Sequence, residues 1–150
     1  MRALFTLLAA LVLLPQIGCG GNSSTSPTSP SGTTGTTGTT GPTTSHNAGR
    51  DCTSCHSFTA AGTVYKPDGT TVNPGAIVRL TTQSAGGGTV VASLTADGSG
   101  NFYTSTPIGF GSGLYVTATN SAGSSRAMGA TITSGACNRC HSSMNRIVTD

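Results

Sequence analysis

The sequence contains no tryptophan and only seven aromatic residues, and only 11 of its 150 residues are charged. Few aromatic side chains predict a small protein core and leave no stacking platform for a polysaccharide. The low charge is unlike a typical cytosolic surface. Together with 22 glycines and many serines and threonines, it favours an exported β-protein with a flexible stalk. No basic cluster follows a nucleic-acid backbone, which excludes that class of partner.

The chain has one long apolar run, residues 3–14, which only Thr6 interrupts. Arg2 precedes the run and Pro15 ends it. A bilayer core requires about 20 apolar residues, so the run is too short for a transmembrane helix. It has the length and flanks of a secretory signal. We therefore predict a signal peptide over residues 1–18 and export of the mature chain.

The residues after the run read Gln16-Ile17-Gly18-Cys19. This stretch resembles the bacterial lipobox, although that family prefers Leu where Gln16 stands. The resemblance implies that Cys19 becomes the lipidated first residue of the mature chain. Gly20 is not the acidic residue associated with inner-membrane retention, which favours an outer-membrane lipoprotein on the periplasmic or cell-surface side. The alternative is ordinary cleavage near Gly18, which would leave an exposed free thiol.

Residues 19–45 are low in complexity and consist mainly of Ser, Thr, Gly and Pro. Such a segment cannot bury enough apolar surface to fold. We interpret it as a tether between the lipid anchor and the rest of the chain.

A β pattern begins after residue 60. Val, Ile, Thr, Tyr and Phe are enriched in short segments separated by turn residues, and Val78 and Leu80 alternate onto one face, as do Leu114, Val116 and Ala118. Residues 96–100 predict a hairpin turn. The expected strands are 62–66, 76–82, 89–95, 101–105, 114–119 and 126–133. Evenly spaced short strands predict an all-β sandwich over residues 61–133.

Residues 62–80 read G-T-V-x-x-P-D-G-T-x-V-x-x-G-A-x-V-x-L, residues 95–102 read T-A-D-G-S-G-N-F, and Tyr115 follows. This pattern resembles carboxypeptidase-regulatory-like domains. The resemblance implies a small immunoglobulin- or transthyretin-like β-sandwich without catalysis of its own. It concerns the fold and indicates little about function.

Two C-x-x-C-H motifs flank the predicted sandwich, one in residues 46–60 and one in residues 134–150. They are Cys52-Thr53-Ser54-Cys55-His56 and Cys137-Asn138-Arg139-Cys140-His141. This is the attachment pattern of c-type haem. Two thiols three positions apart on a helical turn reach the two vinyl groups of one porphyrin, and the next His faces the iron. We predict two covalently bound haem c groups, with His56 and His141 as proximal ligands.

Other uses of these cysteines must be weighed. The five cysteines divide into the two pairs and Cys19. A zinc site shared by both pairs is an alternative, but the interval between them far exceeds zinc-finger spacing. Redox thiols would require a thioredoxin-like βαβ setting, which the sequence lacks. Long-range disulfides are a further alternative in an oxidising compartment.

One His and two Met residues are candidates for the remaining axial positions. His46, shortly before the first motif, is the only His outside the motifs, and we predict that it is the distal ligand of the first haem. A solvated linker His is the alternative. For the second haem we predict Met128, although it would also suit the core of a strand. An open or water-ligated iron, or a His from another molecule, is the alternative. Met144 would share the helical face of His141 and so should not reach the opposite side of the haem.

The paired motifs resemble those of small dihaem c-type cytochromes, a resemblance that implies electron transfer rather than catalysis. We expect other redox proteins, such as cytochromes, as partners, with self-assembly as an open hypothesis. Two alternatives remain: a peroxidase-like enzyme using an open site on the second haem, and a β-sandwich that binds a surface component.

Overall fold

The computed structural model describes residues 45–150. The predicted signal peptide, Cys19 and nearly all of the predicted tether lie outside this part of the chain. The described residues form two β-sheets with very little helix, which confirms the predicted all-β class. Within residues 45–150, no helix is long and apolar enough to cross a membrane.

The first sheet is organised around one buried strand, β1 (Ala60–Tyr65). β4 (Asn101–Thr104) pairs with it antiparallel on one side. Two short strands pair with it in parallel: β7 (Gly135–Ala136) near its start and β8 (Ile147–Val148) near its end. β1 therefore holds the chain on both sides of the second motif.

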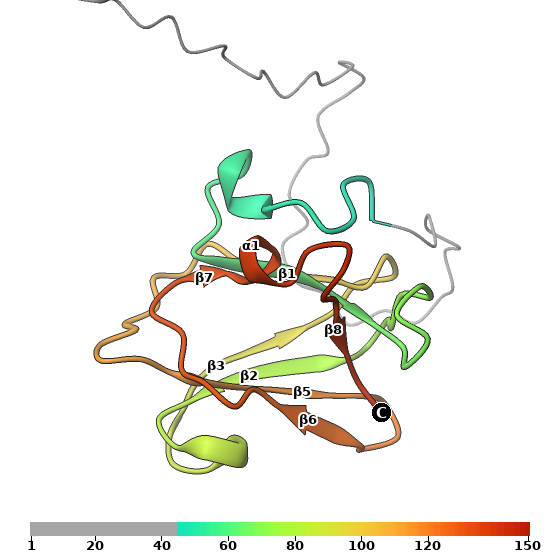
Figure 1. Ribbon diagram of the computed structural model, residues 1–150. Coiled ribbons are helices and arrows are strands. Elements are labelled where there is room, and N and C mark those ends of the chain that lie inside the picture. Colours follow the sequence, from blue (N-terminus) through green and yellow to red (C-terminus); the bar gives the residue numbers. More distant parts are fainter. Residues whose placement is uncertain (1–44) are drawn as a thin grey trace, which may run out of the picture. The chain divides into compact units, whose positions relative to one another are not determined.

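The second sheet has the strand order β3-β2-β5-β6 and is antiparallel throughout. Figure 1 shows it facing the first sheet, with the first motif and α1 together beside β1 and β7. Its strands are β2 (Ile77–Thr81), β3 (Val90–Thr95), β5 (Tyr115–Thr119) and β6 (Ser125–Ala127).

The core lies between the two sheets. The predicted alternation is confirmed on the faces that meet in the core, because Val78, Leu80, Leu114, Val116 and Ala118 are all buried. They join the other members of one apolar cluster, Val64, Ala76, Ala96 and Phe102.

Two expectations about strands were wrong. The predicted strand over residues 126–133 ends at Ala127. Beyond it the chain borders a pocket and pairs again only at an isolated bridge between Ile132 and Leu114. The turn at residues 96–100 is tight, with the Gly100 amide donating to the Asp97 carbonyl at 2.9 Å. It does not close a hairpin, however, since β3 and β4 belong to different sheets.

Both motifs adopt one short helical turn. The first contains the 3-10 helix η1 (Cys52–Ser54), and the second is α1 (Cys137–Cys140). A second 3-10 turn, η2 (Ser84–Gly86), follows β2 far from either motif in sequence. The predicted helical spacing of the thiols is thus confirmed.

Candidate haem sites

The two motifs share one backbone arrangement. The amide of His56 donates to the Cys52 carbonyl at 3.0 Å, and the amide of His141 donates to the Cys137 carbonyl at 2.9 Å. Each hydrogen bond closes a single helical turn from the first Cys to the His. Both pairs of cysteines and their adjacent His therefore have the local geometry that the C-x-x-C-H pattern predicts.

A capping interaction holds the first motif in place. The Asp51 carboxylate accepts hydrogen bonds from the Thr53 amide at 2.9 Å and the Thr53 hydroxyl at 2.6 Å. Side chains of this type satisfy the free amides at the start of a helical turn. Asp51 thus orients Cys52 from the position directly before it.

The second motif lies beside a large apolar pocket. The pocket has a volume of about 840 Å³, and its lining includes Cys137, Cys140, His141 and Met128. Core residues form its floor, namely Val78, Phe102, Val116 and Ala118. A pocket of this size fits the usual range for bound organic groups, roughly 300–1,000 Å³.

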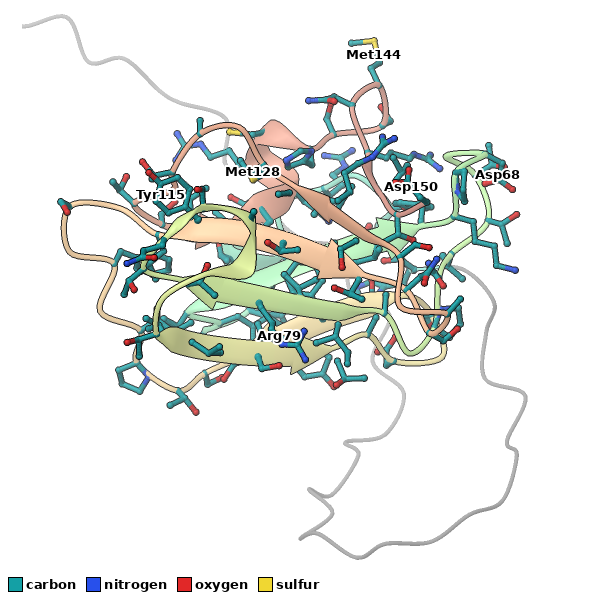
Figure 2. The ribbon with its side chains drawn as sticks, turned by 90° about the horizontal axis from the view of Figure 1, so that it is seen from below. Asp68, Arg79, Tyr115, Met128, Met144 and Asp150 are labelled. Carbon is teal, nitrogen blue, oxygen red and sulfur yellow. The ribbon has the colours of Figure 1, made fainter. Side chains whose placement is uncertain are left out.

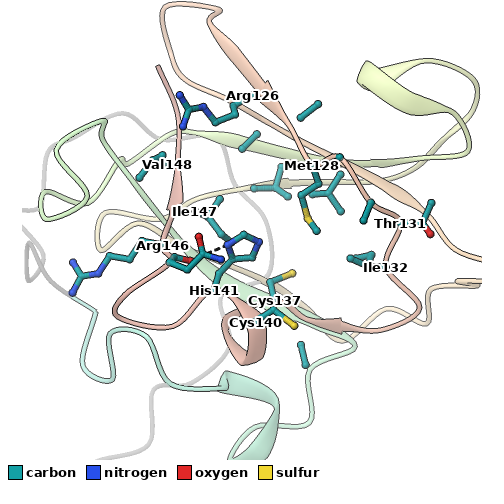
Figure 3. Close-up of a pocket in the computed structure, with 18 of the residues that line it drawn as sticks. Arg126, Met128, Thr131, Ile132, Cys137, Cys140, His141, Arg146, Ile147 and Val148 are labelled. Carbon is teal, nitrogen blue, oxygen red and sulfur yellow. Dashed lines mark hydrogen bonds between the residues drawn. The ribbon is translucent and has the colours of Figure 1, made fainter.

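Met128 extends into this pocket after β6. Its side chain is half-buried and packs against the core cluster. In Figure 3 its sulfur points toward the side on which Cys137, Cys140 and His141 lie. The structure therefore brings the predicted distal ligand into the same pocket as the predicted proximal ligand.

Met144 has no part in this pocket. Its side chain is 95% exposed, and Figure 2 shows it projecting away from the rest of the molecule. The reason given from the sequence was wrong, since α1 ends at Cys140 and His141 is no longer helical. Met144 and His141 therefore do not share a helical face.

A hydrogen bond orients the His141 ring. Its Nδ1 lies 3.0 Å from the Asn145 carbonyl oxygen. A carbonyl only accepts, so Nδ1 carries the proton and Nε2 keeps its lone pair. This is the tautomer in which a metal-binding His holds its metal through Nε2.

A half-buried cation, Arg146, lies at the edge of the pocket. The Arg146 guanidinium stacks over the Tyr65 ring, with its Cζ 4.4 Å from the ring centroid. It also donates to the Gly69 carbonyl at 2.7 Å. Its Nε is buried and has no hydrogen-bond partner. A buried donor of this kind fits an anionic group such as a propionate carboxylate. Arg126, on the same pocket, forms an exposed ion pair with Asp150 at 2.9 Å.

The first motif lies against a row of aromatic rings. The His56 ring stacks on Phe58 with centroids 5.0 Å apart, and Phe58 stacks on Tyr103 at 4.8 Å. His56 and Tyr103 are both exposed. The His of the first motif thus faces solvent, whereas the second motif lines the pocket beside the core.

His46 lies close to His56, as the sequence predicts for a ligand pair. The two ring centroids are 6.1 Å apart, with the ring planes perpendicular. With metal–nitrogen bonds of about 2 Å, as for zinc, two imidazoles on opposite sides of one ion have centroids about 6 Å apart. The observed separation is compatible with joint ligation of one iron.

Burial lowers the reactivity of two of the thiols. It raises the pKa of Cys137 to about 12, and a smaller contribution comes from nearby Cys52. Burial is likewise the largest cause of the raised pKa of Cys52, followed by the charge of Asp51. Catalytic redox thiols require a lowered pKa. Cys52 and Cys137 therefore lack the lowered pKa of a nucleophilic redox thiol.

Within residues 45–150, no three His, Cys, Asp or Glu side chains converge as a cluster that could hold a metal ion. A haem iron does not need one, because the protein supplies only its axial ligands.

No family model, curated protein or solved structure matches this chain. The resemblances drawn from the sequence therefore stay predictions.

Proposed function

We propose that this chain is a dihaem c-type cytochrome that transfers electrons at the cell envelope. One haem would be attached at residues 52–56 and the other at residues 137–141. The observation that carries the proposal is the second motif. Two thiols, an oriented His and a Met line one apolar pocket.

Each residue of the second site would have a distinct role in binding the haem. Cys137 and Cys140 would anchor the porphyrin, and His141 would ligate iron through Nε2. Met128 would be the second protein ligand of the iron, and Arg146 would neutralise a propionate. The apolar floor of the pocket would exclude water. A haem bound here supplies one-electron chemistry at iron.

Attachment would require each cysteine to be a free thiol. Each thiol would then add across one vinyl group: an S–C bond would form, and the thiol hydrogen would move to the neighbouring vinyl carbon. Cys55 is disulfide-bonded in the structure. Attachment at the first motif therefore requires prior two-electron reduction of that bond by a dithiol reductant.

The alternatives are less well supported by this geometry. Met128 in the pocket favours an iron with both axial positions filled, whereas a peroxidase-like enzyme requires an open one. Lipidation of Cys19 and export to the outer membrane remain part of the proposal. They would place the electron-transfer domain on a tether at the membrane.

The test is a spectroelectrochemical titration of the chain produced with a cytochrome c maturation system. We expect two reversible one-electron steps per chain, with the first, exposed haem at the lower potential. His/His ligation there and His/Met ligation at the second site would separate the two potentials. A colourless protein with no reversible step would overturn the proposal.

A further inference from the structure

The two motifs contact each other through Asn138, which is only 3% exposed. Its Nδ2 lies 3.7 Å from the Cys52 sulfur and 3.3 Å from the Thr63 hydroxyl. Its Oδ1 accepts a hydrogen bond from the Thr63 amide at 3.1 Å. One residue of the second motif is thus fixed to β1 and also touches a haem-attaching thiol of the first motif.

The backbone brings the same two segments together. β7 runs parallel to β1, with Ala60 opposite Gly135 and Ala61 opposite Ala136. A side chain at Gly135 would collide with Thr59 and Ala60, so only glycine allows this approach.

A second glycine marks another close contact. Gly49 has a φ of +77°, and a Cβ there would lie 2.7 Å from the Ser143 backbone nitrogen. The segment before the first motif therefore packs on the segment after the second one.

We propose that the two haem sites form one contiguous unit, with Asn138 as the residue that sets the spacing between them. This inference rests on the proposed function. A thioether holds the edge of a porphyrin at its cysteine sulfur, and the Cys52 sulfur lies in contact with the second motif. The two porphyrins therefore meet across Asn138 rather than at opposite ends of the sandwich.

Proximity has an electrostatic consequence. The interaction between two charges grows as their separation and the local dielectric constant fall. Oxidation of one iron adds a positive charge beside the other and disfavours its oxidation. The two sites titrate as a coupled pair, so the oxidation state of one haem shifts the potential of the other.

The first test uses the wild-type holoprotein, so no variant has to fold. Electron paramagnetic resonance of the fully oxidised protein should show magnetic interaction between two ferric centres. Two independent signals in a protein shown to carry two haems would overturn the inference and leave the proposed function intact. Absence of haem would instead remove the function.

The second test compares two separate variants at adjacent positions, each of which lowers the net charge by one unit. Burial raises the pKa of a carboxyl at the position of Asn138, so the potentials are measured across a range of pH. Once the new carboxyl is ionised, Asn138→Asp should lower both potentials, because Asn138 lies between the sites. Arg139→Gln is the matched control: it makes the same change in net charge on an exposed neighbour, where solvent screens it. Arg139→Gln should lower only the potential of the second haem, and by a smaller amount than Asn138→Asp does. If both variants shift only the second potential, Asn138 does not lie between the haems.

Discussion

The His141 ring shows how much a single hydrogen bond determines. Donation from Nδ1 to the Asn145 carbonyl at 3.0 Å selects the tautomer and limits rotation of the ring. The acceptor belongs to the backbone of the turn that leads into β8, so pairing of β8 with β1 also supports the orientation of the ring. In a haem-bound chain this contact would tune His141 as a ligand as well as hold it.

Met128 offers a direct test at the residue scale. Met128→Leu preserves volume and should cost less than about 1.5 kcal/mol of stability. It removes the thioether, so we expect the second haem to become high-spin and its potential to fall.

Met144→Leu is the control for that variant, since Met144 is 95% exposed. It should leave the spin state and both potentials unchanged. Magnetic circular dichroism and a redox titration measure these properties. An unaltered spectrum in Met128→Leu would exclude Met128 as a ligand.

Some of these residues were predictable from sequence and others were not. His46 and Met128 follow from counting the His and Met residues near the motifs. Asn138 occupies a variable position of its motif, and its role depends on contacts with Thr63 and Cys52 that the sequence does not reveal. The stacking of Arg146 on Tyr65 likewise depends on the fold.

At the scale of elements, predictability follows the length of the repeating pattern. β2 and β5 alternate over several residues, and their faces were expected correctly. β7 and β8 have two residues each, too few for an alternation to be visible. They are strands only because β1, far away in sequence, provides partners.

The elements place the two motifs in different surroundings. The second motif borders a pocket whose floor is the core between the sheets, whereas Ser54, Cys55 and His56 of the first are exposed. A haem in the second site would complete the core, and one in the first would cover a surface.

We therefore expect unequal effects on stability. Cys137→Ser with Cys140→Ser should lower the free energy of unfolding by about 5 kcal/mol, as for the largest core truncations. Cys52→Ser with Cys55→Ser should approach the surface range of about 0.5 kcal/mol. Chemical denaturation followed by circular dichroism measures both variants. Equal losses would contradict the placement of the second haem in the core.

At the scale of the molecule, the two segments that flank the predicted sandwich are integrated into the fold. β7 and β8 lie in the segment that carries the second motif, and both add to the first sheet. η1 leads directly into β1, which also holds those two strands. One strand thus positions both motifs, and the described part of the chain is built around that arrangement.

The intact mass of the mature protein, measured under denaturing conditions, tests the central claim most directly. Thioether bonds survive denaturation, whereas a non-covalently bound group is lost. Protein matured in a cytochrome c-producing cell should exceed the polypeptide mass by two haems, and by a lipid if Cys19 is modified. A mass equal to that of the unmodified chain, or of the chain with lipid alone, would contradict the account.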